Sequence, residues 1–166
     1  MKVRELSLSD IGAMWSINQQ GLPGTGAVSS EEMADLLTLA ELALGVEDAG
    51  NLLGFVLCLN PGTRYGSLNY AWFNERYENF IYVDRIAVAP SHRSKGIGSA
   101  LYRKVVEYSQ RHMCPIAAEV SLDPPNPGSM RFHGRFHFDQ VGILEHEDKA
   151  VTMMLRINTS EMTGLP

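Results

Sequence analysis

Hydrophobic positions near the N-terminus change their spacing along the chain, and each change predicts a different element. Residues 3–8 predict a short strand. Ser9 and Asp10 can cap a following helix, whose apolar side chains fall on one stripe: Ile11, Met14, Trp15 and Ile17. The glycines and the proline at 21–26 then predict a loop.

A second helix and a pair of strands are expected next. The side chains at 29–32 suit a helix start, because hydroxyls cap a helix and carboxylates favour its positive end. This helix is predicted to end near residue 39. Apolar residues at 42–47 and 52–59 predict two strands joined by a turn at 48–51.

The rest of the chain alternates strands with helices, apart from a long connection at 60–79 that is rich in aromatic residues. A connection of this length inside a compact domain is often functional. The expected elements are a central strand at 80–88, a helix at 96–111, a strand at 116–122, a short helix at 129–136 and strands at 138–144 and 150–157. This order predicts an α/β sheet with helices on its faces. We expect one domain over 1–158 and a C-terminal tail at 159–166.

Composition narrows the class of protein. The 166 residues fit one domain, and 45% hydrophobic with 20% charged residues is ordinary globular composition. A net charge of -5 argues against a dedicated nucleic-acid binder, which needs a basic surface. Two cysteines make no disulfide framework. Because we find neither a membrane-spanning run nor a signal-peptide core, a cytoplasmic protein with no membrane partner is expected.

The segment at 82–101 carries the clearest chemical signal. It consists of a strand, a basic turn and a helix that begins at Gly96 and Gly98. The first N–H groups of a helix have no partner within it and attract phosphate. Residues 92–104 include four Lys and Arg and no carboxylate, which agrees with an anion site. The alternative is a surface helix with a glycine-rich start. The segment matches neither a P-loop nor a dinucleotide fingerprint.

Two motifs resemble signatures of the GCN5-related N-acetyltransferase (GNAT) superfamily. The first is Arg93-x-x-Gly96-x-Gly98 after a strand, and the second is Asn126-x-x-Ser129-x-x-Phe132-His133-x-x-x-x-Phe138. The element order from 3 to 157 is similar too. The amino-acid sequence of the strand at 82–88 resembles that of a bacterial subgroup of predicted acetyltransferases. The resemblance implies a mixed, mostly antiparallel, twisted sheet of about seven strands. Helices would cover both faces, and strands four and five would splay apart.

The resemblance also implies acetyl-CoA as co-substrate, no metal, and a primary amine of a small molecule or peptide as acceptor. Strand residues would contact the pantetheine arm, the turn would wrap the diphosphate, and Asn126 would hold the arm from the other side. The residues assigned to the cofactor are Ile86, Ala87, Val88, Arg93, Ser94, Lys95, Gly96, Ile97, Gly98, Ser99, Asn126, Ser129 and Phe132. Members of the superfamily often dimerise, so a homodimer is possible.

Direct transfer to an amine needs a base, because an alkylammonium has a pKa of roughly 10. Glu119 is the candidate, since it lies on the polar face of its strand and its counterpart in some members of the superfamily has this role. A solvated strand carboxylate is the alternative. Asp84 is the rival base, and its alternative is an ion pair, with Arg85 among the possible partners.

Two histidines depart from the superfamily pattern. His133 takes the position where a tyrosine acid is usual, and imidazole can donate a proton near neutral pH. Alternatively His133 packs beside the thiol and Tyr82 donates. His137 replaces a glycine, and histidine tolerates a left-handed backbone better than most residues. We reject a metal site on these two histidines, because no third ligand is evident. Cys58 lies in an apolar strand, which favours an inert buried thiol over a nucleophile.

The aromatic connection at 60–79 has three interpretations: a lid over the acceptor, part of a dimer face, or additional core. For the lid, the residues expected at the acceptor are Tyr70 and Trp72, together with Asp84. A non-catalytic acyl-CoA-binding regulatory module is the competing function. This alternative remains because His133 stands where the superfamily usually has a tyrosine acid.

Overall fold

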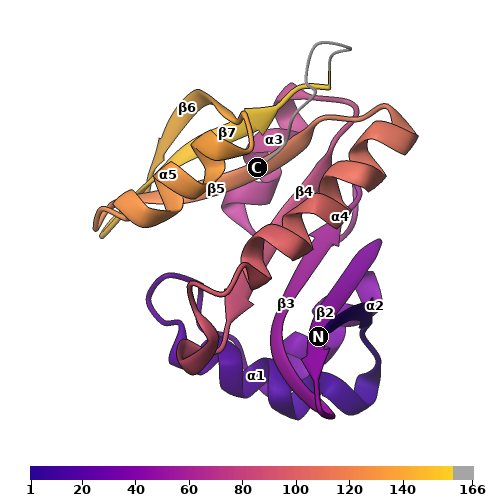
Figure 1. Ribbon diagram of the computed structural model, residues 1–166. Coiled ribbons are helices and arrows are strands. Elements are labelled where there is room, and N and C mark those ends of the chain that lie inside the picture. Colours follow the sequence, from indigo (N-terminus) through magenta and orange to yellow (C-terminus); the bar gives the residue numbers. More distant parts are fainter. Residues whose placement is uncertain (159–166) are drawn as a thin grey trace.

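The computed structural model describes residues 1–158, which build one seven-stranded sheet (Figure 1). The strands lie in the order β1-β2-β3-β4-β5-β7-β6. Their bounds are β1 Lys2–Glu5, β2 Leu42–Asp48, β3 Asn51–Leu59, β4 Ile81–Val88, β5 Ile116–Asp123, β6 Asp139–Glu145 and β7 Ala150–Arg156. All neighbours are antiparallel except β4 and β5. The mixed, mostly antiparallel α/β fold and the central position of β4 are therefore confirmed.

Five α-helices cover the two faces of the sheet (Figure 1). Their bounds are α1 Ile11–Gln20, α2 Ser30–Leu39, α3 Leu68–Arg76, α4 Ile97–His112 and α5 Pro127–Arg135. Side chains of α4, and Phe132 with Phe136 beside them, pack in one core on one face. On the other face, α1 and α2 cover one part of the sheet and α3 covers the part near β5 and β7. Two short 3-10 turns, Leu8–Asp10 and Pro90–His92, complete the described chain.

The N-terminal prediction was partly wrong. The first strand ends at Glu5 rather than at residue 8, because the Asp10 carboxylate accepts the N–H of Ser7 at 2.8 Å and turns the chain there. Asp10 precedes α1 but makes no side-chain cap to it. Instead Asp10 forms an ion pair with Arg4 at 2.9 Å. The second helix is as predicted, with Ser29 and Glu32 in a capping box.

The connection at 60–79 contains a helix that the sequence analysis did not predict. Ser67 caps α3 by accepting the N–H of Tyr70 at 3.3 Å. Tyr70 and Phe73, three residues apart, are 1% and 0% exposed and enter the core beside β4 and β5. The predicted tail at 159–166 lies outside the described residues.

The strands β4 and β5 share only a short stretch of ladder. Ile81 pairs with Ile116 and Tyr82 with Ala117, and no further pair joins the two strands within residues 1–158. A β-bulge follows at once, because Leu57 of β3 pairs with Arg85 and Cys58 pairs with Val83, which leaves Asp84 as the extra residue. The predicted splay between strands four and five is thus confirmed.

Gly54 lets the start of α4 approach the sheet closely. A Cβ atom at this position would lie 2.9 Å from Ile97 Cγ2 and 3.0 Å from the Ala87 carbonyl oxygen. We expect Gly54→Ala to lower the free energy of unfolding by about 1–3 kcal/mol, as overpacking does. Urea unfolding measures this. The matched control is Gly12→Ala, where nothing lies within 4 Å of the new Cβ, and an undiminished stability of Gly54→Ala would contradict the prediction.

Candidate active site

A cleft of about 1030 Å³ opens where β4 and β5 separate. Residues 83–88 of β4 form one wall, and Ala118, Glu119 and Ser121 of β5 face them. The α1–α2 loop at 21–28 and the segment before α3 close one side. Tyr102 of α4 and His133 of α5 line it as well. The cleft therefore reaches side chains from both faces of the sheet.

The turn at 93–96 leads from one end of this cleft into α4. Arg93 lines the cleft, and Gly96 has a left-handed φ of 77° and offers no side-chain cap to the helix. The N–H groups of residues 97–99 consequently have no acceptor inside α4. Ser94 is also left-handed, with a φ of 64°. The residues from Arg93 to Gly96 are exposed, so an anion can reach this helix start.

Helix α5 begins at the cleft and packs against the start of α4. Asn126 caps α5 by accepting the N–H of Ser129 at 3.2 Å, and both residues line the cleft. Phe132 packs toward Gly98, because its ring atoms would lie 3.6 Å from a Cβ placed there. The two sequence motifs thus meet in space at Phe132 and Gly98. Of the residues assigned to the cofactor, those that line the cleft are Ile86, Ala87, Val88, Arg93, Asn126 and Ser129. The side chains of Ile97 and Ala87 are 2% and 8% exposed and pack into the core.

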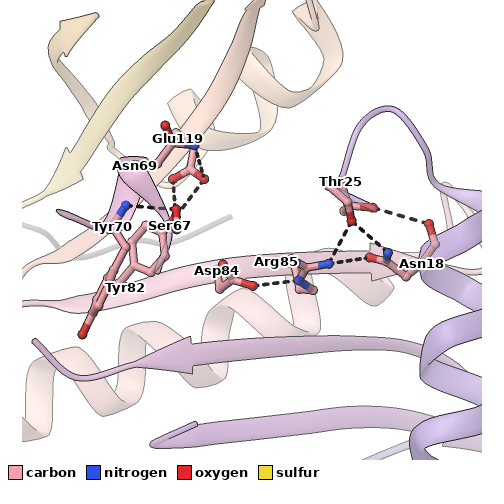
Figure 2. A network of polar contacts seen from close by, with 10 residues as sticks. Asn18, Thr25, Ser67, Asn69, Tyr70, Tyr82, Asp84, Arg85 and Glu119 are labelled. Atoms are coloured by element: carbon pink, nitrogen blue, oxygen red, sulfur yellow. Dashed lines mark hydrogen bonds and ion pairs between the residues drawn. The ribbon is translucent and has the colours of Figure 1, made fainter. Parts of the chain in front are cut away.

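Glu119 lies at the centre of a polar network between β4, β5 and α3 (Figure 2). The Tyr82 hydroxyl is 2.8 Å from both carboxylate oxygens, and Asn69 Nδ2 donates to Oε1 at 3.2 Å. Burial raises the pKa of Glu119 to about 7, and the charge of Asp84 acts in the same direction. The hydrogen bonds from Tyr82 and Asn69 oppose this rise. A carboxyl with this pKa can exchange a proton near neutral pH.

Asp84 is held in an ion pair with the neighbouring Arg85 (Figure 2). Arg85 Nε donates to Asp84 Oδ2 at 2.7 Å, and the two side chains are 6% and 4% exposed. Arg85 also donates to Asn18 Oδ1 at 3.1 Å and to the Gly26 carbonyl at 3.0 Å. Asp84 therefore has the ion pair that the sequence analysis gave as its alternative, and Arg85 fixes the loop that walls the cleft.

His133 is buried on the other face and contacts polar groups of Ser129 and Tyr102. Its Nδ1 lies 2.8 Å from the Ser129 carbonyl oxygen, so Nδ1 carries the hydrogen. In the neutral ring Nε2 is then an acceptor, and the Tyr102 hydroxyl at 2.6 Å donates to it. Burial lowers the pKa of His133, which favours this neutral form.

The candidate base and acid approach the cleft from opposite faces. Glu119 is bonded to Tyr82 and Asn69, on the face that α3 covers. His133 is bonded to Tyr102, on the face that α4 covers. The cleft thus has a carboxylate side, bordered by the loop at 21–28, and a side where the helix start and the histidine lie.

Two residues predicted to contact the acceptor lie away from the cleft. The Tyr70 hydroxyl bonds to the Asn60 carbonyl and accepts the Thr63 N–H at 2.9 Å. Trp72 packs on Gly142 and carries Arg76 over its ring at 4.0 Å. Neither lines the cleft, so both serve packing, and the connection reaches the cleft with Tyr65, Ser67 and Asn69 instead.

The remaining sequence expectations concern His137, the cysteines and metals. His137 has a left-handed φ of 68°, so the turn that normally needs glycine is retained. Cys58 is fully buried, and burial raises the pKa of its thiol. Within residues 1–158 no group of three or more His, Cys, Asp or Glu side chains is placed to hold a metal ion. No helix in this range has the length and apolar character needed to cross a bilayer.

The sheet with its splayed fourth and fifth strands is the fold of the GNAT acetyltransferases. The acetyltransferase (GNAT) family matches residues 14–138, and the chain belongs to this family. The resemblance drawn from the two motifs is therefore confirmed, and the family's co-substrate is acetyl-CoA. A search of curated proteins found no match.

Solved structures with the same fold are distant in sequence. Ard1 from Thermoplasma volcanium has a TM-score of 0.78 and 20% identity, covering 96% of this chain and 98% of that one. Ribosomal-protein-alanine N-acetyltransferase from Brucella melitensis has a TM-score of 0.73 and 17% identity, covering 95% and 100%. Arabidopsis thaliana NAA60 in complex with acetyl-CoA has a TM-score of 0.73 and 18% identity, covering 95% and 99%.

The residues present fit the co-substrate of the family. The uncapped start of α4 offers main-chain N–H groups to a diphosphate, and Arg93 and Lys95 add positive charge beside it. Beyond Tyr82 the backbone of β4 pairs with β3 on one edge, while its other edge has left β5, faces the cleft and can bond to an amide-containing arm. The cleft volume of about 1030 Å³ is large enough for such an arm together with an acceptor.

Proposed function

We propose that this protein is an N-acetyltransferase that moves an acetyl group from acetyl-CoA directly to a primary amine of a small molecule or peptide. The observation that supports this most is the cleft between β4 and β5, with an uncapped helix start at one end and Glu119 on the opposite face. Acetyl-CoA supplies the acetyl group as a thioester. The acceptor enters past the loop at 21–28, where both reactants can be bound together.

Glu119 is the base in this proposal. Its ionised carboxylate takes a proton from the acceptor ammonium, directly or through water, and the amine lone pair becomes free to attack. Because its pKa is raised to about 7 by burial, Glu119 is a stronger base than an exposed carboxylate. Asp84 is the weaker candidate, since its carboxylate is already paired with Arg85 at 2.7 Å.

His133 supplies the proton for the departing thiolate, acting through Tyr102. In the protonated ring, Nε2 donates to the Tyr102 oxygen, and the Tyr102 hydroxyl proton is then free to pass to the sulfur. His133 loses one proton, the thiolate gains one, and Tyr102 ends unchanged. The 2.6 Å separation of Nε2 and the hydroxyl supports this pair. A thiolate with a pKa of roughly 8.5 accepts the proton near neutral pH.

The pH dependence of kcat follows from these two groups. The reactive state has Glu119 ionised and His133 protonated. Because the pKa of Glu119 is about 7 while that of His133 is lowered from 6.5, this state is a minor one, and its fraction falls at pH values below the pKa of His133 and above the pKa of Glu119. We expect a bell-shaped profile. In His133→Phe the alkaline fall should disappear; a variant that keeps it would exclude the role of His133.

The activity itself is tested by thiol release from acetyl-CoA across a panel of amines and peptides with free N-termini. The result expected is release that requires both acetyl-CoA and an amine, with mass spectrometry showing one added acetyl group on the acceptor. Thiol release that is independent of every amine, with no acetylated product, would contradict the proposal.

A non-catalytic acyl-CoA-binding module is the second candidate. The hydrogen bonds of His133 favour it, because in the neutral ring the only proton already points to the Ser129 carbonyl. Binding without turnover, with a thermal stabilisation of about 2.7 kcal/mol at a hundred times the dissociation constant, would support the module. Turnover on any amine that depends on Glu119 would exclude it.

A further inference from the structure

A chain of hydrogen bonds leads from the hairpin between β6 and β7 to the carboxylate of Glu119. His146 directly follows β6, and its Nε2 lies 2.9 Å from Asn69 Oδ1. The same amide donates from Nδ2 to Glu119 Oε1 at 3.2 Å. His146 and Asn69 are 77 positions apart in the sequence. Three separate segments therefore meet at the candidate base.

The chemistry of the three groups fixes the direction of each bond. An ionised carboxylate only accepts, so Asn69 must turn its nitrogen toward Glu119 and its oxygen toward His146. An amide oxygen also only accepts, so Nε2 of His146 carries a hydrogen. Both the neutral Nε2–H tautomer and the imidazolium have this hydrogen. The link to Asn69 therefore holds in either charge state of His146.

We propose that His146 is a positioning residue for Glu119, acting through Asn69. The inference rests on the proposed function, in which Glu119 is the base. His146 holds the Asn69 amide in the one orientation that donates to the carboxylate. Without His146 the amide loses the partner of its oxygen, and rotation by half a turn would place that oxygen against the carboxylate.

The loss of His146 should change the pKa of Glu119 in one direction. Burial raises the pKa of Glu119, while the hydrogen bonds from Tyr82 and Asn69 lower it. Loss of the Asn69 bond should therefore raise this pKa further. The other groups that act on Glu119 come from β4 and α4, and a change at His146 leaves them in place: Tyr82, Asp84, Arg85 and Tyr102. Lys149 of the hairpin lines the same cleft.

The test compares His146→Ala with His146→Gln, whose side-chain amide can still donate to Asn69. Carbon-13 NMR follows the titration of the Glu119 carboxyl in the free protein. We expect a pKa about one to two units higher in His146→Ala, as suits the loss of one hydrogen bond to a charged group, and a value near wild type in His146→Gln. Glu147→Gln, on the same hairpin and exposed, is the control and should not raise the pKa.

A double-mutant cycle tests whether His146 acts on Glu119 through Asn69. Asn69→Ala should raise the pKa of Glu119 as much as His146→Ala does, and the double variant should raise it no further, since both changes remove the same bond. An unchanged Glu119 pKa in His146→Ala, or additive effects in the double variant, would overturn the proposal.

The same variants separate this inference from the proposed function. In an active enzyme, the alkaline limb of the kcat profile, which follows the pKa of Glu119, should move to higher pH in His146→Ala and return in His146→Gln. If wild-type protein acetylates no amine, the proposed function fails. The NMR titration still decides the positioning link, because it needs neither acetyl-CoA nor an acceptor.

Discussion

Glu119→Gln is expected to lower kcat by a hundredfold or more, since removal of a general base typically costs about 10²–10⁴ in rate. Glutamine retains the size of the side chain and an oxygen that accepts from Tyr82 and Asn69, which now lie 2.8 Å and 3.2 Å from the carboxylate. The network is preserved and only the ionisable group is lost. Steady-state kinetics at saturating acetyl-CoA and acceptor measures the change.

The stability of the same variant provides the control. The folded-state pKa of Glu119 is raised from 4.5 to about 7, so ionisation is less favourable in the folded protein than in the unfolded chain. This lowers the stability of wild type as pH rises from about 4.5 to 7, and the loss is complete above that range. Glu119→Gln should therefore unfold at a higher temperature than wild type at pH 8. An inactive variant with a lower Tm would show a folding defect instead.

Arg85→Met is expected to lower the free energy of unfolding by about 3–5 kcal/mol, as removal of one partner from a buried ion pair does. It leaves the Asp84 carboxylate, 4% exposed, without its cation. It also removes the bonds at 3.1 Å and 3.0 Å that hold Asn18 and the loop carbonyl of Gly26. Chemical denaturation measures this cost.

Two further variants separate the causes of that loss. Asp84→Asn combined with Arg85→Met removes the uncompensated charge and should recover part of the stability. Arg64→Met breaks an ion pair of 2.6 Å with Asp35 whose side chains are 67% and 49% exposed, and exposed pairs contribute less than about 1 kcal/mol. An Arg85→Met cost as small as that of Arg64→Met would contradict the account.

Periodicity and turn chemistry predicted most of the fold. The capping pattern at 29–32 and the alternation at 116–122 gave elements close to their observed bounds. The helix α3 was missed because its buried stripe is short and aromatic, with Tyr70 and Phe73 set among polar residues. Ser67, which caps it, was the available signal. The early end of β1 depends on Asp10 and Arg4, a tertiary contact that local pattern does not reveal.

The residues of the candidate site also fall into those that belong to a local motif and those whose role depends on a contact with a distant part of the chain. The turn at 93–99 and the start of α5 were predicted because each is a local motif. Tyr102, Asn69 and His146 were missed, since their roles depend on contacts across 31, 50 and 77 positions respectively. The Asp84–Arg85 pair was only one of two interpretations. Neighbouring strand residues normally face opposite sides, and the β-bulge that places Asp84 outside the ladder became visible only in the structure.

The most direct test of the account follows the backbone amides of residues 94–99 by two-dimensional proton–nitrogen NMR while coenzyme A is added. We expect the largest shifts at the N–H groups of residues 95–99, where α4 begins without a side-chain cap. Pantetheine, which lacks the diphosphate, should leave these amides unchanged. Coenzyme A binding with no response at these amides, or no binding at all, would contradict the claim that this helix start holds the diphosphate.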